Sequence, residues 1–329
     1  MNDGNGHRTE LELVARGRLI PAVSGDVLLS ASITPGNALL ALWTAESDVD
    51  AIAGRVTDPG GASFPTTRPS RPVATRVTLH DPETRLLTEF AALPMAHPSV
   101  HSMPDGQLLV VGARAEWRPE GADRNAVLYD AEGRVLAEET LGDGIQQVVT
   151  TRGGRIWVGY TDEGVYGNFG WGFDGPEPLG ASGLVRYDAA LRRDWEFPAI
   201  NAGLDTIDDC YALNLDGETA WVCYYSDFSV VRIRDGVVKA WTNEVHSAAA
   251  LAVAGDTVAF AGGYAPDRHR LVLARLGGDS VHVTGEYRLT LPGGKPLPAR
   301  STLFGQGSVV HVLTEDAWYT LDITRSPLR

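Results

Sequence analysis

The feature that most constrains the fold is a local motif that recurs six times along the sequence. Each copy has an apolar segment, a short turn, and a second segment in which apolar and small residues alternate. Asp-Gly and Gly-Gly pairs suit such turns because they tolerate the positive φ that two-residue β-hairpins require. The predicted turns are Pro35-Gly36, Asp105-Gly106, Gly153-Gly154, Asp216-Gly217, Gly255-Asp256 and Gln306-Gly307. Each interval between turns has room for four strands.

A second motif follows the hairpin in four of these units. It is an apolar segment that ends in Asp, with a basic residue four positions later. The pairs are Asp81 and Arg85, Asp130 and Arg134, Asp188 and Arg192, and Asp235 and Lys239. An Asp at such a position accepts hydrogen bonds from backbone amides two residues on, so we interpret these acids as turn formers between the third and fourth strands.

Repeated four-strand units predict an all-β fold, the six-bladed β-propeller. Too few residues follow Gln306 for a complete last blade, and the N-terminal segment TELELVARGRLIPAV is predicted to supply the missing outer strand. Pairing the first strand with the last closes the fold and protects its edges. We expect one propeller domain over residues 8–329, preceded by a disordered or extended N-terminus at residues 1–7.

Composition limits the partners and the compartment. Hydrophobic residues make up 43% of the chain, enough to build a core, and the net charge is −14. Without a cluster of Lys and Arg, nucleic acids and anionic membranes are poor partners. The first residues lack the apolar segment of a secretion signal, and no later run is long enough to span a bilayer, so a cytoplasmic location is predicted.

The two cysteines, Cys210 and Cys223, have a defined relation if Asp216-Gly217 forms a two-residue turn. They would then face each other directly across two strands. We favour a reduced, packed pair, with a redox-active disulfide as the alternative.

Long insertions are predicted between the second and third strands of four units. They cover residues 44–72, 115–123, 162–182 and 265–269. In a propeller such loops all rise from one face, where they surround the mouth of the central channel. This face is therefore the predicted binding face.

The polar residues that enter the inner strands are predicted to line that mouth. They are His97, Gln146, Gln147, Asp208, Asp209, His246 and Arg300. Asp162 belongs to an acidic lip at the ends of the second strands, and with Asp208 and Asp209 it is a candidate ligand of a divalent metal, Mg or Ca. No other cofactor is indicated.

The insertion at 162–182 adds Tyr166, Phe169 and Trp171, which could cover an apolar ligand. An equally weighted alternative is that these rings attach the loop to the adjacent blade. Polar residues at the mouth have an ordinary alternative too, because they can satisfy backbone ends and bind water. His101, in the middle of an apolar strand, is predicted to be a hydrogen-bonded core histidine.

The strands G-x-I-W-V-G, from Gly154, and A-W-V-C, from Ala220, resemble those of bacterial NHL-like and streptogramin-lyase-like propellers. WD40 propellers are a weaker match because the Gly-His and Trp-Asp signatures are missing. The resemblance to streptogramin lyases implies metal and histidine chemistry on a propeller face. That family generally has seven blades, and its catalytic residues do not match here one by one. Regucalcin-like lactonases hold calcium through a glutamate and asparagines, and the predicted mouth has no asparagine.

Two functions follow from the predicted face. The first is a binding module that holds a small molecule, a peptide or a protein. The alternative is a metal-assisted lyase or hydrolase, in which a metal or Arg300 polarises a carbonyl and His246 or His97 moves a proton. We favour the binding module because it requires fewer specific residues, and catalysis stays an open alternative.

Overall fold

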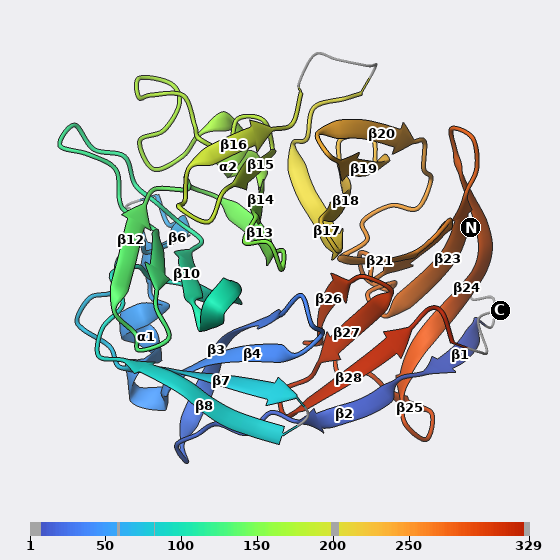
Figure 1. Ribbon diagram of the computed structural model, residues 1–329, viewed down its shortest axis with the longest axis horizontal. Coiled ribbons are helices and arrows are strands. Elements are labelled where there is room, and N and C mark those ends of the chain that lie inside the picture. Colours follow the sequence, from blue (N-terminus) through green and yellow to red (C-terminus); the bar gives the residue numbers. More distant parts are fainter. Residues whose placement is uncertain (1–7, 58–59, 82, 199–203, 326–329) are drawn as a thin grey trace. The chain divides into compact units, whose positions relative to one another are not determined.

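The computed structural model describes residues 8–57, 60–81, 83–198 and 204–325, and in these residues it contains six sheets with a four-stranded core (Figure 1). In each core, strands that follow one another along the chain pair side by side. The predicted fold class, a six-bladed β-propeller, is confirmed. The chain divides into two compact units, which we call the middle unit, Ile20–Cys210, and the terminal unit, which joins the segment up to Leu19 with the chain from Tyr211 onward.

The middle unit contains three of the sheets. Their strands are β3 (Asp26–Ile33), β4 (Leu39–Ala45), β7 (Thr75–Asp81) and β8 (Glu83–Phe90); β9 (Pro98–Ser102), β10 (Leu108–Gly112), β11 (Ala126–Tyr129) and β12 (Val135–Glu139); and β13 (Ile145–Thr150), β14 (Ile156–Tyr160), β15 (Leu184–Tyr187) and β16 (Arg193–Glu196). Second strands such as β10 and β14 are buried along their whole length, whereas the fourth strand β12 is mostly exposed. The apolar runs of the sequence therefore lie where both faces of a sheet are covered.

The terminal unit contains the other three sheets. Their strands are β17 (Asp209–Asp216), β18 (Thr219–Tyr225), β19 (Val230–Arg234) and β20 (Val237–Trp241); β21 (Ala250–Ala254), β22 (Thr257–Ala261), β23 (Arg270–Leu276) and β24 (Val281–Leu291), extended by β25 (Lys295–Pro296); and β26 (Thr302–Gln306), β27 (Val309–Leu313) and β28 (Ala317–Asp322). The first two residues of β17 belong to the middle unit.

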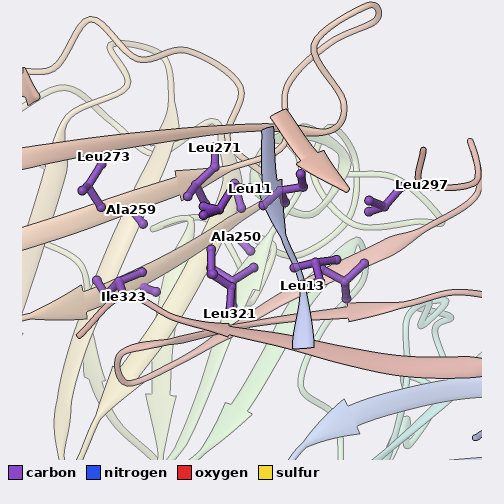
Figure 2. Close-up of a cluster of buried hydrophobic side chains, with 14 residues drawn as sticks. Leu11, Leu13, Ala250, Ala259, Leu271, Leu273, Leu297, Leu321 and Ile323 are labelled. Carbon is purple, nitrogen blue, oxygen red and sulfur yellow. The ribbon is translucent and has the colours of Figure 1, made fainter. Parts of the chain in front are cut away.

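The N-terminal segment completes the last sheet, as predicted. Strand β2 (Val14–Arg18) pairs antiparallel with β28, from Val14 opposite Thr320 to Arg18 opposite Ala317. A further strand, β1 (Thr9–Glu12), pairs in parallel with β24 and was not predicted. Figure 2 shows Leu11 and Leu13 among buried side chains of β23, β28 and neighbouring segments, with exposed fractions of 4% and 2%. The N-terminal segment is thus part of the core.

Small residues set the spacing between neighbouring sheets inside each unit. A Cβ on Gly159 of β14 would lie 2.3 Å from Sγ of Cys210, and one on Gly305 of β26 would lie 1.7 Å from the backbone oxygen of Leu251. No side chain fits at either position. The predicted alternation of apolar and small residues therefore reflects close packing between sheets.

The hairpin turns agree with the prediction in part. Asp105 and Gly106 both have positive φ, and Ala254 pairs with Thr257 around Gly255-Asp256. Two turns begin one residue later than predicted, at Gly217-Glu218 and Gly307-Ser308, because the glycine occupies the first turn position with φ of 60° and 55°. The predicted turns at Asp216-Gly217 and Gln306-Gly307 are therefore wrong by one residue.

The shifted turn removes the basis for a direct pairing of Cys210 with Cys223. Both cysteines are buried and form no disulfide with each other, and the reduced form favoured from the sequence stays a prediction. Burial raises the pKa of Cys223 to about 12, and its Sγ donates a hydrogen bond of 3.3 Å to the backbone oxygen of Phe228. This thiol is inert at neutral pH.

Two of the four predicted Asp turn formers act as expected. Asp130 accepts hydrogen bonds from the backbone amides of Glu132 and Arg134, at 3.0 Å and 2.8 Å, and forms an ion pair with Arg134. Asp188 does the same with Ala190 and Arg192. Asp235 instead has a φ of 51° in a tighter turn, since its neighbour Gly236 also has positive φ.

Two further predictions concern the extent of the domain. The expected disorder of residues 1–7 lies outside the described residues, and a single domain over 8–329 stays a prediction. Within the described ranges, no helix has the length and apolar character needed to cross a bilayer.

Candidate ligand-binding site

Three long insertions of the middle unit meet one another. They connect the second and third strands of its sheets, as predicted, over residues 46–74, 113–125 and 161–183. The first contains η1 (Glu46–Asp48), α1 (Val49–Ile52) and the hairpin β5 (Arg55–Thr57) and β6 (Ser63–Pro65), and the third begins with α2 (Asp162–Tyr166). We call them insertions A, B and C in chain order.

Backbone and ring contacts hold insertion C against insertions A and B. The backbone amide of Trp117 donates to the oxygen of Phe169 at 2.9 Å, and the indole Nε1 of Trp171 donates to the oxygen of Ala115 at 2.8 Å. The ring of Phe169 meets that of Phe64 edge to face, 6.3 Å between centroids. The three insertions therefore form one packed layer.

Glycine allows insertion C to approach insertion B. Gly170 has a φ of +83°, and a Cβ there would lie 2.5 Å from the backbone oxygen of Trp117. Any other residue would combine an unfavourable backbone conformation with a steric clash. The glycine-rich sequence after Asp162 is explained by these close contacts.

The first of two ion networks centres on Asp123 of insertion B, which is 5% exposed. Its Oδ1 accepts hydrogen bonds of 2.7 Å from both Arg68 of insertion A and Arg118, and its Oδ2 accepts one of 3.1 Å from the amide of Glu116. Burial alone would raise the pKa of Asp123, but hydrogen bonds from Thr67, Arg118, Glu116 and Arg68 outweigh it and hold the pKa below its usual value. The carboxylate thus stays charged and joins insertions A and B.

The second network joins insertions B and C through Arg114. This side chain is buried and makes two contacts of 2.9 Å with the carboxylate of Asp143, together with an ion pair to Glu163 on α2. Burial raises the pKa of Asp143 to about 6, although Arg114 acts in the opposite direction. The guanidinium carbon also lies over the ring of Phe169, 4.6 Å from its centroid, and this contact helps to hold the ring in place.

A groove of about 470 Å³ opens between the insertions. Its apolar surface comes from Val56, Phe64, Pro65 and Phe169. Its charged residues are Arg68, Arg118 and Glu116, which already pair with one another or with Asp123, and Thr66, Thr67 and Asn168 add uncharged polar groups. An apolar cavity with a few fixed polar groups is the usual form of a small-ligand site.

The three predicted aromatic residues of insertion C have three different roles. Phe169 lines the groove, as a ligand-covering ring should. Trp171 is 6% exposed and attaches the loop to insertion B, so for this ring the alternative interpretation applies. Tyr166 is 61% exposed, and its hydroxyl donates a 2.5 Å hydrogen bond to Asp208.

The predicted metal ligands Asp162, Asp208 and Asp209 lie near one another. The amide of Asp162 donates to Oδ1 of Asp209 at 3.1 Å, and burial together with the charges of Asp162 and Asp208 raises the pKa of Asp209. Over residues 8–57, 60–81, 83–198 and 204–325, no group of three or more His, Cys, Asp or Glu is arranged to hold a metal ion. The metal site stays a prediction.

The other predicted mouth residues of the middle unit occupy the expected places at the strand entrances. Gln146 is exposed at a bulge near the start of β13, and Gln147 pairs with Gly159 in the ladder. His97 precedes β9, and its Nε2 lies 2.9 Å from the backbone oxygen of Gly54, while burial lowers its pKa. His97 therefore connects β9 to insertion A, and its role in catalysis stays a prediction.

In the terminal unit, His246 and Arg300 are both exposed. His246 precedes β21, and its imidazole stacks on Phe228 with 4.5 Å between centroids. Arg300 precedes β26. Their proposed catalytic roles stay predictions as well.

Residues that the sequence analysis did not single out make up most of the groove. Val56, Phe64, Arg68 and Arg118 belong to insertions A and B, which were recognised only as long loops. Apolar residues within a polar loop, such as Val56 and Phe64, were the available signal. Their convergence depends on contacts between segments far apart in the sequence.

His101, by contrast, is a core histidine as predicted. It is 6% exposed, and its Nε2 lies 2.9 Å from Oγ of Ser99. Burial lowers its pKa to about 3, so the ring is neutral at physiological pH.

Comparison with known proteins finds similar proteins but does not establish the family of this chain. The model of the YxzG family matches residues 199–320, which is less than half of the chain. No curated protein matches the sequence.

Several solved structures are similar in strand arrangement. A catalytically inactive variant of virginiamycin B lyase from Staphylococcus aureus, crystallised with quinupristin, has 9% identity and a TM-score of 0.46, covering 92% of this chain and 97% of that one. A putative oxidoreductase (glucose dehydrogenase) from Thermus thermophilus has 10% identity and a TM-score of 0.46, covering 94% and 100%. YCF48 from Cyanidioschyzon merolae has 11% identity and a TM-score of 0.44, covering 93% and 98%. Similarity at this level assigns no activity to the chain.

Proposed function

We propose that the protein is a ligand-binding module, and that the groove between insertions A, B and C holds an apolar or aromatic group of a small molecule or peptide. The observation that carries this proposal is the groove itself, about 470 Å³ with walls of Val56, Phe64 and Phe169. Val56 is 60% exposed, so its side chain is accessible to an occupant of the groove.

The charges around the groove support a neutral or weakly polar occupant. Arg68 and Arg118 both pair with Asp123, and Arg118 also pairs with Glu116, so two positive charges are balanced by two negative ones. These pairs fix the positions of the insertions, so the groove exists before a ligand arrives. Preformed sites bind more tightly because less ordering accompanies binding.

A fluorescent probe tests the proposal. We expect N-phenyl-1-naphthylamine, a neutral dye, to bind the wild-type protein at one saturable site. Phe169→Gly should weaken this binding by about tenfold, since the lost ring contact is worth on the order of 1.4 kcal/mol. Glycine suits this position because Phe169 has a φ of 46°, so the variant should fold.

Two matched variants locate the site. Val56→Gln places a polar group at the groove, whereas Val135→Gln changes a valine of similar exposure on the edge strand β12. Weaker probe binding in the first variant and unchanged binding in the second supports the proposal. Equal binding by the wild type, Phe169→Gly and Val56→Gln would exclude the groove as the ligand site.

A further inference from the structure

A second group of aromatic side chains lies in the terminal unit, apart from the groove and its insertions. It consists of Tyr211 at the start of β17, Tyr225 at the end of β18, Phe228 in the next connection, His246 before β21 and Tyr264 between β22 and β23. We call it the aromatic patch. Four separate stretches of sequence contribute to it, so it is built by the tertiary structure.

The rings of the aromatic patch are in contact with one another. Tyr211 is stacked beside Tyr225 at 6.2 Å, meets Tyr264 edge to face at 6.3 Å, and lies 5.9 Å from Phe228. Phe228 contacts Tyr225 at 5.7 Å and His246 at 4.5 Å. The hydroxyl groups of Tyr211 and Tyr264 are also hydrogen-bonded to each other.

Burial does not account for this patch. Tyr225 is 44% exposed and Tyr264 is 63% exposed, and His246 is exposed as well. By contrast, Trp221 and Trp241 of the same sheet are at most 4% exposed and belong to the core. Contiguous exposed aromatic surface of this kind marks binding sites more often than core packing.

The backbone at the centre of the patch is unfavourable for the residue that it carries. Phe228 has a φ of 59°, in the left-handed region that is unfavourable for a residue with a Cβ. The conformation places the ring between Tyr225 and His246. Such outliers concentrate at functional sites, because the surrounding structure must hold them in place.

The basic side chains next to the patch are already paired. Arg270 donates to the backbone oxygen of His246 at 2.9 Å and lies 3.9 Å from Asp267, which also pairs with Arg8. The carboxylate of Asp227 accepts hydrogen bonds from the amide and hydroxyl of Ser229. An anionic ligand would therefore find no unpaired basic side chain among these groups.

The remaining chemistry of the patch is flat apolar surface beside hydroxyl and imidazole groups. A neutral ligand with one apolar face and a hydrogen-bonding edge matches it, and a pyranose ring has this character: its C–H face stacks on aromatic rings and its hydroxyls reach polar neighbours. We propose that the aromatic patch is a saccharide-binding site, with Tyr225 and Tyr264 as the stacking residues.

Isothermal titration calorimetry with maltohexaose, cellohexaose and xylohexaose tests this proposal on the full chain. We expect at least one of the three to bind. Tyr264→Ala and Tyr225→Ala should each weaken binding by about tenfold, whereas Tyr264→Phe, which keeps the ring, should weaken it by about threefold. Both tyrosines are exposed, so these variants should fold.

Tyr166→Ala is the matched control, since it removes a tyrosine of 61% exposure from the middle unit. Unchanged saccharide binding in this variant supports the assignment to the patch. The proposal is overturned if none of the three saccharides binds, or if the bound one binds equally well to Tyr225→Ala and Tyr264→Ala. Tetramethylammonium binding that Tyr264→Ala abolishes, without saccharide binding, would instead assign the patch to a cationic ligand. The saccharide titration uses none of the groove variants, so the two proposals are tested separately.

Discussion

The middle and terminal units build different surfaces on the same four-stranded sheets. In the middle unit the insertions are long, and residues 46–74 form the longest of them. They are joined by buried ion pairs around Arg114 and Asp123. In the terminal unit, the longest corresponding connection is 262–269, and aromatic rings meet on the surface beside partly exposed ion pairs of Asp267 with Arg8 and Arg270. The excess of acidic over basic residues lies almost entirely in the middle unit. Long loops need internal partners to become ordered, whereas short connections can carry exposed rings on a rigid sheet.

The terminal unit has its own stabilising element, which is the N-terminal segment. Strands β1 and β2 pair with β24 and β28, and they bury Leu11 and Leu13. The middle unit is thus stabilised by buried charges and the terminal unit by buried leucines. Mutations can measure both contributions to the free energy of unfolding.

The largest expected effect is that of Asp143→Ala in the middle unit. The substitution leaves the buried Arg114 without its main partner, and breaking a buried pair in this way costs about 3–5 kcal/mol. Urea unfolding measures this loss as a decrease in the free energy of unfolding. The double variant Arg114→Met/Asp143→Leu should recover most of the loss, and a double variant as unstable as the single one would show that charge is not the cause.

Leu13→Ala should lower the free energy of unfolding by about 3 kcal/mol, since Leu13 is 2% exposed and truncation of its side chain leaves a cavity. Its neighbour Val14 is 63% exposed, so Val14→Ala provides the control and should change stability by less than about 0.5 kcal/mol. Equal effects of the two substitutions in urea unfolding would mean that the N-terminal segment does not stabilise the terminal unit.

Gly170→Ala should lower the free energy of unfolding by about 2 kcal/mol. The unfavourable φ is combined with a distance of 2.5 Å between the added Cβ and the backbone oxygen of Trp117. Gly217 of the β17–β18 hairpin has a φ of +60° and no atom within 4 Å of an added Cβ, so Gly217→Ala should cost about 1 kcal/mol. Thermal unfolding compares the two. A smaller loss for Gly170→Ala than for Gly217→Ala would contradict the packing of insertions B and C.

The effect expected to be smallest at neutral pH is a pH dependence that both units share. Burial lowers the pKa of His101 in the middle unit and of His311 in the terminal unit to about 3. Between pH 3 and pH 6.5 the unfolded chain binds a proton at each histidine and the folded chain does not, so stability falls as the pH falls through this window. The slope is about 1.4 kcal/mol per pH unit for each histidine at most.

His101→Asn and His311→Asn should each flatten the dependence of the unfolding free energy on pH between pH 6 and pH 4. Raised carboxyl pKa values such as that of Asp143 act in the opposite direction, so the comparison is of slopes between the variants and the wild type. An unchanged slope in both variants would mean that neither ring is held neutral by burial.

Sequence reasoning predicted the repeated sheets, the positions of the insertions, the closing strand β2 and the buried His101. These features depend on local signals: glycines at turns, apolar runs, and the number of residues left after the last hairpin. It placed two turns one residue early, because Asp-Gly and Gly-Glu are both acceptable turn pairs and only the strand register distinguishes them. It did not predict β1, whose parallel pairing has no local signature.

The sequence by itself determined that this chain forms propeller-type sheets and that its long loops follow the second strands. Only the tertiary structure decided that Trp171 is buried while Tyr166 is exposed, that Arg114 pairs with Asp143, and that Tyr211, Tyr225 and Tyr264 meet on one surface. The physical reason is the range of the forces involved. Backbone conformation and strand periodicity are set by neighbouring residues, whereas burial and ion pairing depend on segments that come together only when the chain has folded.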